Sequence, residues 1–157
     1  EKSADILVEM QMKKVNLIKK EHIPAGLGIG ISKDEQIAME KADQNARVDL
    51  AKEIDAQMKA LTKNFKEEVG GDIVEHFQTA SKTVVDTRMN GATLTDVKVE
   101  TTEDGQFKIY GIMTLEVDLV SEYLKSLQDT DAANEEMKNK IRAAADKAYA
   151  ELDAQTK

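Results

Sequence analysis

Alternating apolar and small residues predict a first strand near the start of the chain. Leu27, Ile29 and Ile31 fall on one face of an extended segment, and glycines occupy the positions between them. Glycine inside a strand indicates that a helix or a neighbouring backbone approaches this face closely, or that the strand contains a bulge. Ser32 ends the strand and, with Glu35 three residues on, predicts a capping box that opens a helix.

The apolar pattern then changes to helical spacing, which predicts one long helix as far as the Gly70–Gly71 break. Its stripe consists of Ala38, Ala42, Ala46, Leu50, Ile54, Met58, Leu61, Phe65 and Val69. Asp72 and Glu75 predict the start of a second helix, which we expect to stop near Asn90–Gly91. Residues 4–20 fit both a strand and a helical stripe, and we favour a helix for them.

The second half of the chain begins with the clearest hairpin pattern, in which residues 102–105 form the turn between two β-rich runs. In the second run, apolar odd-numbered positions from Phe107 to Val117 alternate with more polar ones, so we expect one buried face and one polar or partly covered face. Residues 119–128 form a short helix or exit segment, and Asp129-Thr130-Asp131 is expected to start a last helix. The apolar side of that helix carries Met137, Ile141, Ala144, Ala148 and Leu152.

This order of elements predicts the α+β class, with a small three-stranded antiparallel sheet packed against two long helices and an additional C-terminal helix. We expect residues 1–128 to form a single α+β domain. Residues 129–157 are then a C-terminal helical appendage that packs on this domain.

Composition narrows the classes of function. Among 157 residues, 30 are acidic and 22 basic, and the net charge of −8 repels nucleic acid and anionic lipid head groups. Aromatic residues make up only 4% and tryptophan is absent, which argues against a stacking platform for bases. The chain has no cysteine and no apolar run near the ~20 residues that cross a bilayer. It begins at Glu1, so we expect that a signal peptide or an expression tag preceded it.

No motif nominates a catalytic, cofactor-binding or metal-ligating residue. The glycines at 26, 28 and 30 lack the third glycine of a dinucleotide fingerprint and lie inside the strand. The two histidines, His22 and His76, are far apart in the sequence, and neither has a second histidine at helical spacing that would complete a metal site. The acidic cluster Asp129, Asp131 and Glu135 lacks the glycine of a calcium loop and is better explained by helix capping. Neither Ser32 nor Ser81 lies in a nucleophile elbow.

Several of these features together resemble one protein family. They are the segment Gly28-Ile29-Gly30-Ile31-Ser32, the helix with Ala38, Ala42, Ala46-Arg47 and Leu50-Ala51, the strand with Val97 and Val99, the Asp104-Gly105 turn and the strand around Tyr110. In this order they resemble the small bacterial envelope lipoproteins typified by the twenty-kilodalton Helicobacter membrane lipoprotein, over residues 25–118. The pattern is also similar to the N-terminal domain of a flagellar assembly protein.

The resemblance implies an exported protein of the outer membrane or periplasm with no enzymatic activity. It also implies a lipidated N-terminal cysteine, which this chain lacks, so membrane attachment requires a cysteine removed before Glu1. We therefore expect a non-enzymatic scaffold or assembly domain that contacts envelope proteins and no nucleic acid, with its oligomeric state left open. The alternative is a periplasmic domain that binds a small ligand between the glycine-bearing strand and a helix. An enzyme of unrecognised type is a third hypothesis. Arg47 either pairs with a carboxylate on the sheet or is exposed, and exposure is the expected state.

Overall fold

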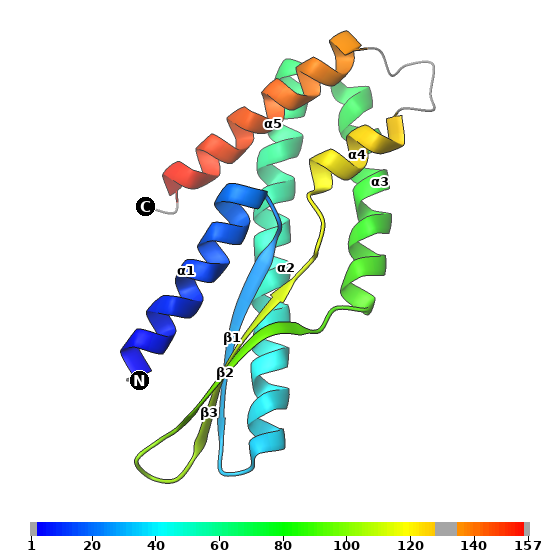
Figure 1. Ribbon diagram of the computed structural model, residues 1–157. Coiled ribbons are helices and arrows are strands. Elements are labelled where there is room, and N and C mark those ends of the chain that lie inside the picture. Colours follow the sequence, from blue (N-terminus) through cyan, green and yellow to red (C-terminus); the bar gives the residue numbers. More distant parts are fainter. Residues whose placement is uncertain (1–2, 128–134, 156–157) are drawn as a thin grey trace. The chain divides into compact units, whose positions relative to one another are not determined.

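The computed structural model describes residues 3–127 and 135–155 and has the predicted α+β class (Figure 1). Its elements are α1 (Ser3–Glu21), β1 (Ala25–Ser32), α2 (Glu35–Glu68), α3 (Gly71–Asn90), β2 (Leu94–Thr101), β3 (Phe107–Thr114), α4 (Leu119–Ser126) and α5 (Glu135–Gln155). The ambiguous residues 4–20 are helical, as favoured above. The proposed start of the last helix at Asp129-Thr130-Asp131 lies outside the described residues.

The chain divides into two compact units. Unit 1 contains residues 1–53 and 91–116, and unit 2 contains residues 54–90 and 117–157. Helix α2 contributes to both, because the division falls within it. The expected boundary between residues 128 and 129 lies in a stretch that the structure does not describe.

Unit 1 is built on a three-stranded antiparallel sheet with the strand order β1-β3-β2. The predicted hairpin turn is confirmed: Gly105 N–H donates to the Thr102 oxygen at 3.0 Å, and Thr102 N–H donates to the Gln106 oxygen at 2.8 Å. Gly105 has φ +81°, a left-handed conformation that favours glycine. Since β3 pairs with both other strands, β1 and β2 are the two edges of the sheet.

The glycine row of β1 lets α2 lie directly on the sheet. A β-carbon at Gly28 would lie 2.1 Å from the Ala42 oxygen and from the Ala46 nitrogen, and Gly26 and Gly30 are equally close to the helix backbone. The β1–β3 register is regular across all three glycines, so close approach explains them and a bulge does not. The helix backbone also fills the space in which the alternative hypothesis placed a ligand pocket.

The opposite face of the sheet is covered by α1. Ile6 and Met10 of this helix form a buried cluster with Tyr110 and Ile112 of β3. Ile109, on the other face, is buried against α2. The second face of β3 was expected to be polar or partly covered, and α1 covers it so fully that Tyr110 and Ile112 are at most 1% exposed.

The start of α2 differs from the expected capping box. The N-cap is Asp34, whose Oδ1 accepts a hydrogen bond from the Ile37 N–H at 3.1 Å. Ser32 lies two residues earlier, and its Oγ accepts from the Asp34 N–H at 3.1 Å. Both residue types cap helices well, and the carboxylate occupies the position that faces the third helical N–H. The predicted capping box of Ser32 and Glu35 was therefore wrong, and the N-cap lies two residues later, at Asp34.

Unit 2 is a helical assembly with an aromatic centre. Phe77 of α3 makes edge-to-face contacts with Phe65 of α2 (ring centroids 4.9 Å apart) and with Tyr123 of α4 (5.2 Å). Helix α4 begins at the N-cap Asp118, which accepts from the Val120 and Ser121 N–H groups. The aromatic contacts join the consecutive helices α2 and α3 to α4, which follows them only after the β2–β3 hairpin.

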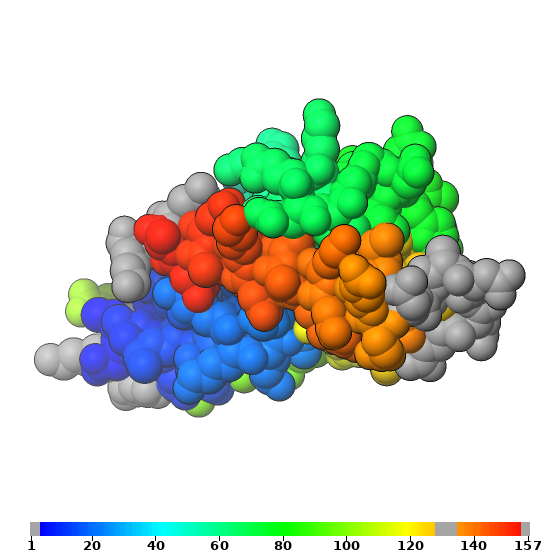
Figure 2. Space-filling model, turned by 90° about the horizontal axis from the view of Figure 1, so that it is seen from above, coloured from blue at the N-terminus to red at the C-terminus, as the bar shows by residue number. Residues whose placement is uncertain are grey.

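Helix α5 packs within unit 2 through the predicted alanine-rich stripe, and Ile141, Ala144 and Ala148 are buried. In Figure 2 its orange-to-red surface runs beside the green surface of α2 and α3. Polar contacts to α2 accompany the packing, since Lys147 Nζ donates to Glu68 Oε1 at 2.6 Å and Asn64 Nδ2 donates to Glu151 Oε2 at 3.3 Å.

Because of Tyr149 in α5, we expect the free energy of unfolding to fall at alkaline pH. Burial raises the pKa of its phenol, and the negative charge of Asp118 raises that pKa further. Above pH 10 the phenol ionises in the unfolded chain but stays protonated in the folded one, so unfolding releases a proton and the free energy of unfolding falls with rising pH. For one phenol the slope approaches about 1.4 kcal/mol per pH unit.

The measurement is urea unfolding of the wild type and of Tyr149→Phe at a series of pH values from 8 to 11. The difference in the free energy of unfolding should be constant up to about pH 10 and should then shrink, because only the wild type loses stability through this group. If the difference in the free energy of unfolding does not change with pH, the pKa of Tyr149 is not raised in the folded protein.

Candidate functional site

The outer edge of β1 is closed by side chains of α2. Three α2 residues, spaced by four, hydrogen-bond to the backbone groups of β1 that point away from β3. The bonds run from Lys41 Nζ to the Ile31 oxygen (3.1 Å), from Asn45 Nδ2 to the Ile29 oxygen (2.7 Å) and from the Leu27 N–H to Asp49 Oδ2 (2.8 Å). Capped in this way, β1 cannot readily pair with a further strand.

The outer edge of β2 is different. Because residues 107, 109 and 111 of β3 direct their backbone groups toward β1, residues 108, 110 and 112 direct theirs toward β2. The antiparallel register then leaves Val97, Val99 and Thr101 with N–H and C=O groups that point out of the sheet. Across residues 3–127 and 135–155, no side chain caps these three residues as α2 caps β1. The edge is open from 97 to 101.

The same two valines expose their side chains on the α2 face of the sheet. Val97 is 36% exposed and Val99 48% exposed, although each lies across from a buried or side-chain-free position of β3. The cause is the glycine row: α2 lies over β1, so β2 extends beyond the cover of the helix. An open backbone edge and two exposed valines therefore coincide on one strand.

The other face of β2 carries charges of alternating sign, at Asp96, Lys98 and Glu100. Each contacts a neighbouring element: Lys13 Nζ is 2.9 Å from Asp96 Oδ2, Lys98 Nζ is 3.7 Å from Glu9 Oε1, and Tyr110 Oη donates to Glu100 Oε1 at 3.2 Å. The hydrogen bond with Asp96 raises the pKa of Lys13. These contacts hold the charged face of the strand toward α1 and leave its outer edge free.

Asp49 closes the edge of β1 with a charged acceptor, and its removal is expected to destabilise unit 1. Its Oδ2 accepts from the Leu27 N–H and from Lys14 Nζ at 2.7 Å. Asp49→Ala leaves a backbone N–H without its acceptor and a lysine without its counter-ion, so the free energy of unfolding should fall by about 1–2 kcal/mol.

Asp43 provides the matched control, because it lies on the same helix and its side chain has similar exposure. It is 3.6 Å from Arg47, an ion pair of the surface type. Asp43→Ala should change the free energy of unfolding by less than about 0.5 kcal/mol. Equal effects of the two substitutions in urea titrations would show that Asp49 does not act through the edge of β1.

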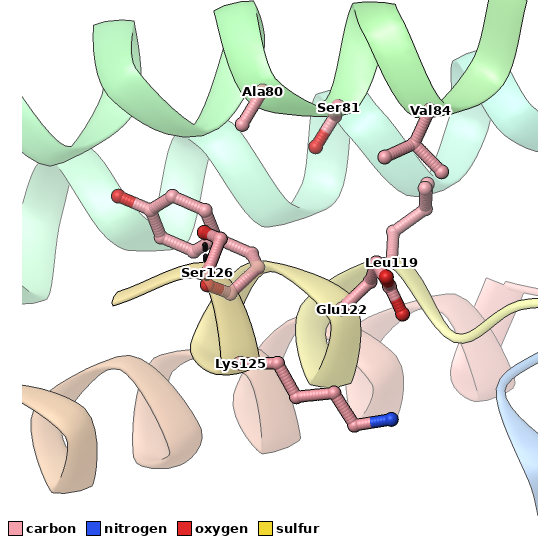
Figure 3. Close-up of a pocket in the computed structure, with 8 residues that line it drawn as sticks. Ala80, Ser81, Val84, Leu119, Glu122, Lys125 and Ser126 are labelled. Atoms are coloured by element: carbon pink, nitrogen blue, oxygen red, sulfur yellow. Dashed lines mark hydrogen bonds between the residues drawn. The ribbon is translucent and has the colours of Figure 1, made fainter. Parts of the chain in front are cut away.

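A second candidate site lies in unit 2, as a groove of about 320 Å³ between α3 and α4. Its lining residues are Ala80, Ser81, Val84, Leu119, Glu122, Tyr123, Lys125 and Ser126. In Figure 3, Ala80, Ser81 and Val84 project from α3 toward α4, whereas Lys125 points away from the groove. Ser126 Oγ donates to the Tyr123 carbonyl at 2.6 Å and is therefore already bonded. The groove is mainly apolar, with polar groups at its rim.

Tyr123 joins this groove to His76. The hydroxyl of Tyr123 lies 2.8 Å from His76 Nδ1, and burial raises the pKa of the phenol. A buried tyrosine hydroxyl normally has such a partner, so the pair is explained by packing. Within the described ranges no group of three or more His, Cys, Asp or Glu side chains is arranged to hold a metal ion.

The other residues considered above have structural roles. His22 follows α1 with φ 56°, and the Ile23 N–H donates to the Leu17 oxygen at 3.0 Å, which closes the end of the helix. Arg47 donates to the Ala92 oxygen at 3.0 Å, so it tethers the segment before β2 and does not point freely into solvent. Ser81 is buried beside the groove. Asp129 and Asp131 lie outside the described residues.

The open edge was not predicted from the sequence. Val97 and Val99 were recognised as strand residues, but which edge of the sheet is capped depends on where α2 lies. The only available signal was the alternation of Asp96, Lys98 and Glu100, which already placed the valines on one face of β2.

Comparisons of the chain with family models, with curated proteins and with solved structures found no match. Of the helices in the described part of the chain, none is both long enough and apolar enough to span a membrane.

Proposed function

We propose that this protein is a non-enzymatic domain of a bacterial cell-envelope lipoprotein that acts through protein contacts as a scaffold or assembly factor. In this proposal the chain is exported, and a lipidated cysteine ahead of Glu1 attaches it to the outer membrane. The family resemblance of residues 25–118 supports the location. The contact role is supported by the open edge of β2.

The single observation that carries the contact role is the difference between the two edges of the sheet. Exposed edge strands are hazardous, and natural sheets normally block them. Here α2 blocks β1 with three side-chain hydrogen bonds, whereas β2 keeps an open edge and two exposed valines. Strand addition is a common way in which a sheet recognises another polypeptide, with the backbone providing affinity and alternate side chains providing specificity.

The first experiment is to express the full gene product in its own host, fractionate the membranes and determine the mature N-terminus by mass spectrometry. A diacylated or triacylated cysteine ahead of Glu1 is the expected result. An unlipidated, cytosolic chain would overturn the location.

The contact role is tested in the same cells by site-specific photo-crosslinking from Val99, with Val48 of α2 as the control. The two valines are matched, being 48% and 49% exposed. Discrete crosslinked adducts are expected from Val99 and not from Val48. Equal adduct patterns would mean that the edge of β2 has no special role.

The groove between α3 and α4 supports a second candidate function, the binding of a small, mainly apolar ligand. Its volume of about 320 Å³ is at the lower end of ligand pockets. A thermal-shift screen of metabolites tests this role, with Val84→Trp as the variant that fills the groove. Ligands that raise the melting temperature of the wild type should fail to stabilise the variant. Stabilisation of both proteins would place the ligand elsewhere.

A further inference from the structure

We propose that the open edge of β2 pairs with the same edge of a second copy of this chain, antiparallel and in a register centred on Val99. The inference rests on the proposed function, because it names the partner of the same edge. Two copies of one strand can form such a pair about a two-fold axis, with each residue i opposite a residue j and j opposite i.

Hydrogen bonding limits the possible registers. Only Val97, Val99 and Thr101 direct their backbone groups outward, so each must lie opposite one of these residues in the second copy. Only the register centred on residue 99 satisfies this condition for all three residues. Registers centred on residue 98 or 100 pair two of the three, and registers centred on residue 97 or 101 pair one residue with its own copy. In the register centred on Val99, the outward-pointing residues pair as Val97 with Thr101, Val99 with Val99 and Thr101 with Val97.

The alternating charges select one of these registers. Centring on Lys98 places the two lysines opposite each other and Asp96 opposite Glu100, which is repulsive at every charged position. Centring on Glu100 places the two glutamates opposite each other and is repulsive for the same reason. Centring on Val99 places Lys98 of each copy opposite Glu100 of the other, so two ion pairs form side by side. The charge pattern of β2 is thus complementary to itself in the register centred on Val99, and it disfavours a register that is shifted so that it centres on Lys98.

The register centred on Val97 is disfavoured by the backbone of β2. Centring on Val97 also sets opposite charges against each other, but it extends the pairing to Thr95. The ladder between β2 and β3 is irregular between Leu94 and Asp96, so the strand is not straight there. Residues 97–101 lie beyond this bulge, and the register centred on Val99 uses these five alone.

Variants with a single introduced cysteine test the register directly, because the chain has no cysteine of its own. In the proposed register the Cα atoms of the two residues at position 99 are about 5.5 Å apart. That separation fits a disulfide. The two residues at position 97 are offset by four residues along the strands, or roughly 14 Å. The structure therefore predicts that Val99→Cys forms a disulfide-linked dimer under mild oxidant at least tenfold faster than Val97→Cys.

Val48→Cys is the control for random collision, because it is as exposed as Val99. Its rate of dimer formation should equal that of Val97→Cys. A rate for Val99→Cys no higher than that of Val48→Cys would overturn the proposal, and fastest crosslinking at Val97→Cys would overturn the register.

Charge exchange provides an independent test that needs no crosslink. K98E places two carboxylates opposite each other, E100K places two ammonium groups opposite each other, and the double variant K98E/E100K restores both ion pairs. Sedimentation equilibrium should show at least tenfold weaker self-association for each single variant and recovery in the double variant. Thermal melts of each monomer establish that the variants are folded, which matters because Lys98 and Glu100 also contact Glu9 and Tyr110.

Failure of this inference is distinguishable from failure of the proposed function. A chain that is lipidated in its host but monomeric at every concentration in sedimentation equilibrium overturns the self-pairing and leaves the function standing. A chain that crosslinks at Val99→Cys but carries no lipid in its host confirms the pairing and overturns the envelope location.

Discussion

Gly28→Ala is expected to lower the free energy of unfolding by more than about 3 kcal/mol, enough to unfold much of unit 1. A methyl group at this position would lie 2.1 Å from the Ala42 oxygen and the Ala46 nitrogen, both of which belong to the backbone of α2. A flexible side chain can rotate away from such a clash, but a helix backbone can yield only by moving off the sheet. That movement exposes Ala38, Ala42 and Ile109 to water.

Two other glycines serve as controls for Gly28. A β-carbon at Gly91 would meet nothing within 4 Å, so Gly91→Ala should be nearly neutral or slightly stabilising. At Gly111 it would meet only the side chain of Leu94, at 2.7 Å, so Gly111→Ala should have an intermediate effect. Urea unfolding followed by circular dichroism gives all three values. A loss at Gly28 no larger than that at Gly111 would contradict the close contact of α2 with β1.

Phe77→Ala is expected to have a comparable effect in unit 2, with a loss of about 3–5 kcal/mol. Phe77 is fully buried, and its ring contacts both Phe65 and Tyr123, so it joins α3 to α2 and α4. Truncation removes two edge-to-face contacts and leaves a cavity at the centre of the aromatic cluster. Amide hydrogen exchange should show faster exchange throughout α3 and α4.

Phe107→Ala is the matched control, because the same atoms are removed from a ring that is only partly buried at the end of β3. Its loss should be about 1 kcal/mol, since partly exposed side chains bury less apolar surface on folding. Similar losses for the two phenylalanines, or unchanged exchange in α4 of Phe77→Ala, would show that Phe77 does not hold these helices together.

Local patterns in the sequence were sufficient to predict most of the helices and strands. The alternation of glycine with Leu27, Ile29 and Ile31 predicted β1, and the turn at residues 102–105 predicted the hairpin of β2 and β3. The Gly70–Gly71 break separated two helices, as observed. These predictions succeeded because strand alternation, helical spacing and turn residues each depend on the chain within a few positions.

The buried polar residues of α2 were not predicted. The expected stripe contained Met58, whereas in the structure Gln57 and Asn64 are at most 1% exposed. Asn64 donates to the Ala60 oxygen and to Glu151 of α5, so its burial depends on a partner that lies 87 residues away in the sequence. A search for apolar spacing has no means of assigning an amide to the interior when its acceptor comes from a distant helix.

The candidate sites depended even more on tertiary structure. The glycine row was interpreted correctly as a place of close approach, but the space in which the alternative hypothesis placed a ligand pocket is filled by α2, and the groove described above lies between α3 and α4. Sequence alone also did not show which edge of the sheet is closed. That choice depends on Lys41, Asn45 and Asp49, which reach the edge of β1 because the glycines allow α2 to lie there.

The sequence by itself determined the α+β class, the order of strands and long helices, and the face of β1 that lies against a helix, because these follow from the periodicity of nearby side chains. Only the tertiary structure decided that β1 is closed, that β2 is open with Val97 and Val99 exposed, and that Phe65, Phe77 and Tyr123 form one cluster. Each of these depends on contacts between residues far apart in the chain, and such contacts are set by how whole helices and strands pack.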